Sequence, residues 1–102
     1  MSHRFSNRVC FICGAYREIE KHHIFGGTNR NKSEADGLTV YLCAGCHRHA
    51  PWSAHQSART AQLLHAFGEM MWLGDKPERT IADFRYRYGR NYLRDYEERD
   101  RR

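Results

Sequence analysis

The sequence predicts an α+β fold, in which a β-hairpin whose ends are joined by a four-cysteine zinc site is followed by two helical segments. Three observations predict it. The chain has 102 residues, the length of one domain with a modest core. It contains two C-x-x-C pairs. Its hydrophobic pattern runs in the order strand, loop, strand, helix, helix. A domain of this size gains from a structural metal, so the cysteines and the elements are interpreted together.

The four cysteines form two matched pairs that are separated by twenty-nine residues. The first residues, MSHRFSNRV, lack the apolar stretch of an export signal, which disfavours a disulfide framework. Two C-x-x-C pairs are typical of tetrahedral zinc ligation, and four thiolates leave no position open for a substrate. The sequence therefore predicts one structural zinc, with the ligands Cys10, Cys13, Cys43 and Cys46.

Two strands are predicted between the cysteine pairs. Residues 16–25 carry β-branched and aromatic side chains without a breaker, and residues 38–42 alternate apolar side chains on one face. A Gly-Gly pair ends the first strand, and the polar residues 28–37 predict a turn-rich loop. Together these segments predict a hairpin whose outer ends are joined by the zinc.

Two helices are predicted after the second cysteine pair. Ser53 and Gln56 match a capping box, so the first helix is expected to begin after Ser53 and to end at Gly74. A shorter helix is expected from about Thr80 to Tyr88, with the following glycine as its terminal residue.

No repeat or low-complexity stretch divides the chain, which predicts a single domain over residues 1–102. We expect its core at about 8–73 and a helical extension at about 75–94. A charged tail at 95–102 completes this division of the chain.

The chain is basic, and arginine supplies most of the positive charge. Seventeen Lys and Arg residues against twelve Asp and Glu give a net charge of +5, and only three of the seventeen are lysine. Arginine suits planar phosphate contacts, so one interpretation is a nucleic-acid partner and the other is an ordinary solvated basic face. No apolar run approaches the roughly 20 residues that cross a bilayer, so we expect no membrane partner and a cytoplasmic location.

Three of the seven histidines occur at informative positions. Neighbouring residues on a strand point to opposite faces, so His22 and His23 cannot both ligate one ion, but one can bind a metal while the other approaches a substrate. His47 follows a zinc cysteine, which would fix its position. Neutral imidazoles ligate catalytic divalent metals, whose open positions accept phosphate oxygens. The alternative is that these three are strand and surface residues without a ligand.

This pattern resembles the HNH endonuclease family, whose active site is a ββα-metal (His-Me finger) unit. The likeness covers roughly residues 10–56 and is carried by the first C-x-x-C pair, by Glu20-Lys21-His22-His23-Ile24 and by Leu42-Cys43-Ala44-Gly45-Cys46-His47. The whole chain also looks like small HNH proteins of bacteriophages. The resemblance implies hydrolysis of DNA phosphodiester bonds with a catalytic divalent metal, which is Mg²⁺, Mn²⁺, Ni²⁺ or Zn²⁺.

The resemblance also implies a role for each histidine of the motif. By position, His22 is the first metal ligand, His23 is the general base that activates water, and His47 is the final metal ligand. Because the predicted helix begins later than is usual in the family, His55 is a further candidate ligand beside His47 or instead of it, and His49 is a weaker one.

One residue of the family pattern is missing. The central Asn would stand just before the second strand, where this chain has Asp36-Gly37. Asn29 and Asn31 lie earlier in the predicted loop, and either is a candidate to hold the loop as that Asn does.

The expected partners are DNA and phage packaging or recombination proteins, in the cytoplasm of the host cell. The DNA backbone is expected to contact basic side chains of the loop and of the second helix, namely Arg30, Lys32, Arg85, Arg87 and Arg90. Tyr86 and Tyr88 alternate with these arginines and are interpreted as packing residues.

Two other functions are open at this point. A non-catalytic, zinc-stabilised nucleic-acid-binding module would need the cysteines and the arginines, but not His22 and His23. A structural partner protein would dimerise through the first helix, where Phe67, Met70 and Met71 give an apolar face.

Overall fold

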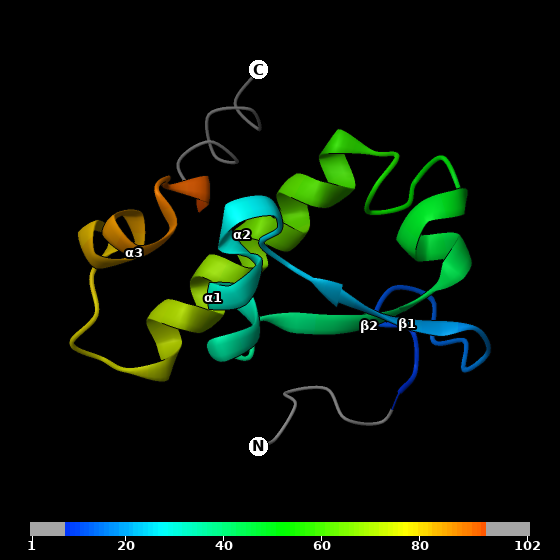
Figure 1. Cartoon of the computed structure of the whole chain (residues 1–102), viewed down its shortest axis with the longest axis horizontal. Helices are drawn as coiled ribbons and strands as arrows, with labels where there is room; N and C mark the ends of the chain where they lie inside the picture. Colours follow the sequence, from blue (N-terminus) through cyan, green and yellow to red (C-terminus); the bar gives the residue numbers. More distant parts are fainter. Residues whose placement is uncertain (1–7, 94–102) are drawn as a thin grey trace.

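The structure is a computed structural model that describes residues 8–93, so the predicted tail at 95–102 lies outside the described residues. Two antiparallel strands, β1 (Ile19–His23) and β2 (Thr39–Cys43), pair from one end to the other. The connection between them holds η1 (Gly27–Asn29) and α1 (Arg30–Ala35). After β2 follow η2 (Gly45–His49), α2 (Ala58–Asp75) and α3 (Ile81–Tyr88) (Figure 1). The predicted α+β class with a hairpin and two C-terminal helices is confirmed.

The strands differ from the prediction at their ends. β1 is shorter than the predicted strand at 16–25, because Glu18 has a left-handed backbone with φ +52° and interrupts the extended chain directly before Ile19. At the other end, one further backbone bond joins Ile24 N–H to Leu38 O at 3.1 Å before the glycines turn the chain. β2 is displaced by one residue from 38–42 and ends at Cys43.

The prediction of a loop at 28–37 was wrong, because this segment contains the six-residue helix α1. No Gly or Pro interrupts Arg30–Ala35, and Gly37 with φ +72° ends the helical conformation. Ser33 of α1 is fully buried, and its hydroxyl accepts a hydrogen bond from Phe25 N–H (3.2 Å) and donates one to Leu38 O (2.6 Å). Ser33 therefore joins the two ends of the connection.

The start of the long helix was predicted too early. Ser53 Oγ accepts from Gln56 N–H at 3.2 Å as expected, but this contact closes a turn. α2 begins at Ala58, where Ser57 Oγ accepts from Thr60 N–H at 3.1 Å. Two overlapping cap signals stand in this stretch, and the second one starts the helix. α2 ends at Asp75, one residue after the predicted Gly74.

The second C-terminal helix agrees with the prediction. Thr80 and Asp83 form a reciprocal capping box at 3.1 and 2.9 Å, and Gly89 ends α3 in the left-handed conformation with φ +87°. α3 is joined to the end of α1 because Asp36 accepts two bonds from the Arg87 guanidinium and one from the Tyr88 hydroxyl.

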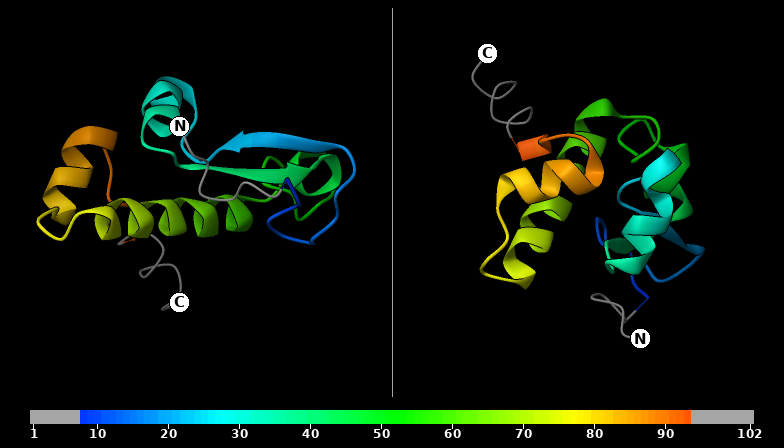
Figure 2. Two further views of the ribbon diagram at one scale, coloured as in Figure 1. Left: turned by 90° about the horizontal axis from the view of Figure 1, so that it is seen from below. Right: turned by 60° about the vertical axis from the view of Figure 1, so that its left-hand side comes forward.

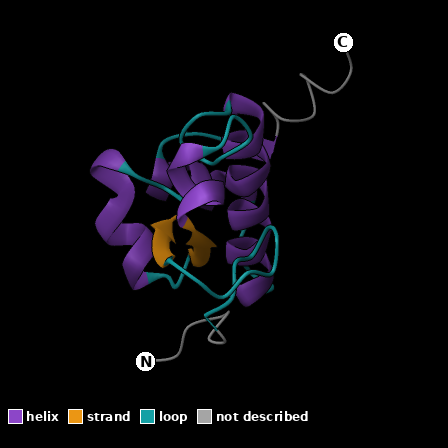
Figure 3. Cartoon of the chain, turned by 90° about the vertical axis from the view of Figure 1, so that its right-hand side faces the viewer, coloured by secondary structure: helices purple, strands orange, loops and turns teal. Residues whose placement is uncertain are grey.

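The core lies between the hairpin and α2, which runs along one face of the strands (Figure 2). Viewed along the strands, the hairpin is flanked by helices (Figure 3). The largest buried apolar side chains come from all layers: Ile24, Phe25, Leu38, Val40, Leu42, Leu64, Trp72, Phe84 and Tyr88. Helix and hairpin approach closely at Gly68, where a Cβ would lie 2.7 Å from Ile24 Cγ2. On the apolar face of α2, Phe67 and Met71 pack against the core, whereas Met70 is exposed.

Within residues 8–93, no helix combines the length and the apolar character that a bilayer crossing requires.

Candidate functional site

The four cysteine sulfurs converge at one end of the hairpin, and we call this group the cysteine cluster. Its members are Cys10, Cys13, Cys43 and Cys46, whose Sγ atoms all lie within 4.8 Å of one another. In each pair the N–H of the second cysteine points to the sulfur of the first, at 3.4 Å in both cases. The first pair is attached to the sheet by Phe11 N–H, which donates to Tyr41 O at 2.8 Å.

The thiols of this cluster have divergent acidities. Burial raises the pKa of Cys10, but backbone N–H groups, that of Cys43 first, outweigh it and bring the pKa down to about 6. Burial raises the pKa of Cys46 to about 12. Four thiolates at this distance repel one another unless a cation lies between them. The four cysteines are thus positioned to bind a metal ion, and an all-sulfur set of four is the donor set of a structural zinc.

A second group, the histidine cluster, consists of His22, His47 and His55. One ring nitrogen of each lies within 4.8 Å of the others, and the Nε2 atoms of His47 and His55 are 3.1 Å apart. The rings come from three different segments: β1, η2 and the turn before α2. Of the two candidate ligands that follow the C-H dipeptide, His55 belongs to this cluster and His49 does not.

A carboxylate orients one imidazole of the histidine cluster. Glu20 Oε1 lies 2.6 Å from His47 Nδ1, and the same carboxylate accepts two bonds from Arg48 at 3.0 and 2.7 Å. Hydrogen bonds from Arg48 and then from His47 lower the pKa of Glu20 to about 2. An ionised acceptor at Nδ1 fixes the proton there and leaves Nε2 of His47 to face the cluster. We had not predicted Glu20, although it stands two residues before His22 and so on the same strand face.

Two imidazoles of the cluster, those of His22 and His55, favour their neutral form. Burial, followed by the nearby His47 and His55, lowers the pKa of His22 to about 4. The pKa of His55 is also lowered, first by burial and then by His47. Neutral imidazole is the form that ligates metals, so the lowered pKa values of His22 and His55 favour metal binding by these two rings.

His23 lies on the opposite side of β1 from His22 but reaches the same depression. Its Nε2 is 2.7 Å from Glu34 Oε1, and Lys21 Nζ lies 3.2 Å from the other oxygen of that carboxylate. The depression, of about 290 Å³, is lined by Lys21, His22, His23, Gly26, Gly27, Arg30, His47 and His55. Glu34 was not predicted either, because its role depends on the unexpected helix α1.

The basic residues predicted to contact DNA have different environments in the structure. Arg30 lines the depression, and Arg85 is exposed on α3. Arg87 instead holds Asp36, Lys32 Nζ donates to Arg87 O at 2.8 Å, and the Arg90 guanidinium lies 5.6 Å from the Tyr92 ring centre. The guanidinium of Arg87 is therefore used in an internal ion pair, and Lys32 makes one internal hydrogen bond.

Asn29 and Asn31, the two candidates to hold the loop, have different environments. The Asn29 amide donates to Tyr88 O at 3.0 Å, which connects η1 to the end of α3. Asn31 is exposed at the surface of α1. Ser33 makes the bonds between the two ends of the connection instead. Its burial is set by tertiary packing, which the sequence alone did not reveal.

The tyrosines of α3 have different environments. Tyr88 is 4% exposed and packs in the core, as predicted. Tyr86 is 93% exposed, so its interpretation as a packing residue was wrong. Two helical residues that are two positions apart, as Tyr86 and Tyr88 are, point to nearly opposite sides of the helix axis. Only one side of α3 faces the core.

Comparison with protein-family models, curated proteins and solved structures finds no match for this chain.

Proposed function

We propose that this protein is a metal-dependent DNA endonuclease or nickase that hydrolyses phosphodiester bonds. One observation carries the proposal: three imidazole nitrogens from separate segments lie within 4.8 Å of one another, in a depression that also contains His23. The cysteine cluster provides a closed, structural site, so the two groups divide structural and catalytic metal chemistry between them. The resemblance to HNH endonucleases, with their ββα-metal unit, agrees with this division.

The donor chemistry of the histidine cluster fits a divalent transition metal. Within residues 8–93 the group consists of three imidazoles and no carboxylate, a donor set that favours Ni²⁺ and Zn²⁺, and less strongly Mn²⁺, over Mg²⁺, which prefers oxygen ligands. Three protein ligands also leave positions for water and a phosphate oxygen. When bound, such an ion supplies Lewis acidity toward the phosphate and the leaving 3′ oxygen.

The residues around the cluster have complementary roles in this proposal. With Glu34 as acceptor, Nε2 of His23 carries a proton and Nδ1 is the basic nitrogen, which takes a proton from the attacking water. Glu34 stabilises the imidazolium that results. Lys21 and Arg30 at the rim of the depression offer positive charge to the phosphates on either side of the scissile bond.

The substrate class follows from charge and resemblance. A net charge of +5 and the arginines at and beyond the depression favour a polyanion. By its likeness to bacteriophage HNH proteins, we place the enzyme with phage DNA packaging or recombination proteins in the host cytoplasm.

Plasmid nicking tests this function. Supercoiled plasmid is incubated with zinc-loaded protein and Mn²⁺ or Ni²⁺, and wild type is compared with His23→Ala and with His49→Ala as the matched control. We expect nicking by wild type and by His49→Ala, and its loss in His23→Ala with a retained fold and zinc content. Unchanged nicking in His23→Ala would remove the proposed base. If wild type binds plasmid but never cuts it, the chain is the zinc-stabilised binding module instead.

A further inference from the structure

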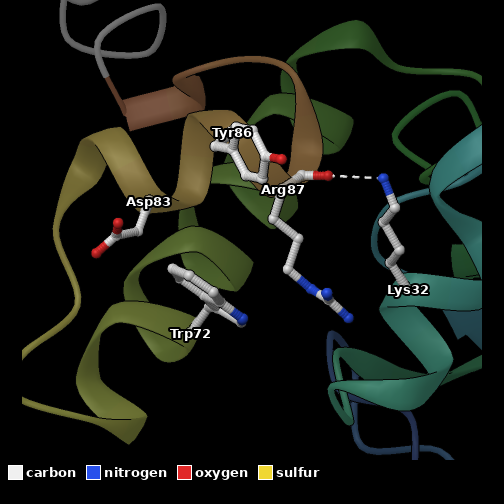
Figure 4. A pocket seen from close by; sticks show the side chains of 5 residues that line it. All are labelled: Lys32, Trp72, Asp83, Tyr86 and Arg87. Atoms are coloured by element: carbon white, nitrogen blue, oxygen red, sulfur yellow. Dashed lines mark hydrogen bonds between the residues drawn. The ribbon is translucent and has the colours of Figure 1, made fainter.

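A separate hollow of about 630 Å³ opens between α1, α2 and α3. We call it the α1–α3 hollow, and Figure 4 shows the five residues that line it: Lys32, Trp72, Asp83, Tyr86 and Arg87. Its volume is within the roughly 300–1,000 Å³ of small-molecule sites. None of these residues belongs to the cysteine cluster, the histidine cluster or the depression beside it.

A buried donor without an acceptor lies at this hollow. Trp72 is 6% exposed, and its indole Nε1 has no hydrogen-bond partner among the described residues. The ring is held in place by Arg79, whose guanidinium lies 3.9 Å from the ring centre and donates to Trp72 O at 2.7 Å. A buried N–H without an acceptor costs roughly 1–3 kcal/mol, so its position at a hollow indicates a site for an acceptor atom.

Two cationic side chains, Arg87 and Lys32, line the same hollow. Figure 4 shows the Trp72 nitrogen and the Arg87 guanidinium facing the space between α2 and α1, while the Asp83 carboxylate points away from it. Arg87 holds Asp36 through Nε and Nη2, which leaves Nη1 outside that pair. Lys32 Nζ uses one bond on Arg87 O. Although Asp36 balances the charge of Arg87, N–H donors of Trp72, Arg87 and Lys32 line the same hollow, and such donors suit an acceptor-rich anion such as phosphate.

An aromatic ring projects from the rim of the hollow. Tyr86 is 93% exposed, so packing does not explain an aromatic residue there, whereas Phe84 and Tyr88 supply the aromatic core contacts of α3. Cationic groups next to an exposed aromatic ring are the combination by which proteins hold unpaired nucleotides, with the phosphate on the cations and the base stacked on the ring.

We propose that the α1–α3 hollow binds a nucleotide whose base is unpaired, with its phosphate toward Trp72, Arg87 and Lys32 and its base on Tyr86. The nucleotide belongs to a single strand or is free in solution, because both present the same phosphate and base. This site goes beyond the proposed hydrolysis and does not depend on it, since binding needs neither His23 nor the histidine cluster.

The test measures binding in the absence of added divalent metal, so that cleavage plays no part. Affinity for a fluorescent single-stranded oligothymidylate is measured by anisotropy for wild type, Tyr86→Phe, Tyr86→Ala and Lys32→Gln. Tyr16→Ala is the matched control, because Tyr16 is 78% exposed and lies outside the hollow. We expect Tyr86→Ala to weaken binding about 5- to 150-fold, the range for loss of one stacked base. Lys32→Gln should weaken it too, while Tyr86→Phe and Tyr16→Ala should not.

A second readout follows the buried donor itself. In a nitrogen-15 NMR spectrum, assigned with a Trp52→Phe sample, the Trp72 indole cross-peak should move when the oligonucleotide is added. Movement with thymidine monophosphate or inorganic phosphate as well identifies a site that accepts free nucleotides, and movement with the oligonucleotide alone identifies a strand site. The proposal is overturned if Tyr86→Ala binds the single strand as tightly as Tyr16→Ala does, or if no probe moves the cross-peak.

Discussion

Removal of the Glu20 carboxylate should weaken divalent-metal binding at the histidine cluster without loosening the zinc. Glu20 Oε1 lies 2.6 Å from His47 Nδ1, so Glu20→Ala removes the acceptor that fixes the proton and the orientation of this ring. Outer-shell partners of this kind contribute roughly 10- to 100-fold in metal affinity. The His47 ring would still pack at 5.1 Å from the His22 ring and 4.7 Å from the His55 ring, which retains part of its orientation. We therefore expect a loss in the lower part of that range, about 10- to 30-fold.

The assay is calorimetric titration of Mn²⁺ into zinc-loaded protein. The matched control is Glu34→Ala, because Glu34 also holds a histidine but lies on the other face of β1 and contacts His23 instead of the cluster. Glu34→Ala should bind Mn²⁺ as wild type does and lose nicking activity. The reasoning is refuted if Glu20→Ala binds Mn²⁺ as tightly as wild type, or if Glu34→Ala loses as much affinity.

Three further predictions concern stability. Gly68→Ala should lower the free energy of unfolding by about 1–2 kcal/mol, because a Cβ would meet Ile24 Cγ2 at 2.7 Å and the overpacking exceeds the gain in helix propensity. Gly74→Ala, with no atom within 4 Å, should instead raise it by up to about 1 kcal/mol, and equal thermal shifts in the two variants would contradict this. Metal analysis should find about one zinc per chain, and strong chelation or Cys43→Ser should unfold the protein, as followed by circular dichroism; a native spectrum without zinc would contradict a structural site. Burial lowers the pKa of His65 below its ordinary 6.5, so the folded state binds fewer protons and the free energy of unfolding should fall as pH drops below about 6.5. Urea titrations at a series of pH values should show that the free energy of unfolding depends less on pH in His65→Gln than in wild type. An unchanged dependence would mean that another group causes it.

The features that were predicted from sequence have local causes. The cysteine cluster follows from the C-x-x-C spacing, because each backbone N–H reaches the sulfur three residues before it. α3 follows from Thr80, Asp83 and Gly89, whose signals act within one turn of the helix ends. Each of these signals acts between residues that are close in sequence, so it can be recognised in the sequence alone.

The features that were missed depend on tertiary contacts. α1 is short, and a helix of six residues has little intrinsic stability; its place is set by the buried bonds of Ser33. The roles of Glu20 and Glu34 arise only when β1 lies against η2 and α1. The membership of His55 in the histidine cluster depends on the path of residues 50–57, where the helix begins after Ser57 and not after Ser53, as predicted.

The two clusters share the short segment η2, so we expect metal binding at one to affect metal binding at the other. Cys46 and His47 are adjacent in this five-residue turn, and their carbonyls accept from Ala54 N–H at 2.9 Å and His55 N–H at 3.0 Å. An ion on Cys46 therefore fixes the turn that presents His47 and, through those two bonds, the segment that presents His55. By linkage, an ion on the histidine cluster should tighten zinc binding by the same factor, although the cysteine sulfurs themselves are positioned by backbone N–H groups. Zinc loss should therefore abolish Mn²⁺ binding, whereas His22→Ala should weaken Mn²⁺ binding at full zinc content. The coupling is contradicted if removal of zinc leaves Mn²⁺ binding unchanged and removal of Mn²⁺ leaves zinc binding unchanged.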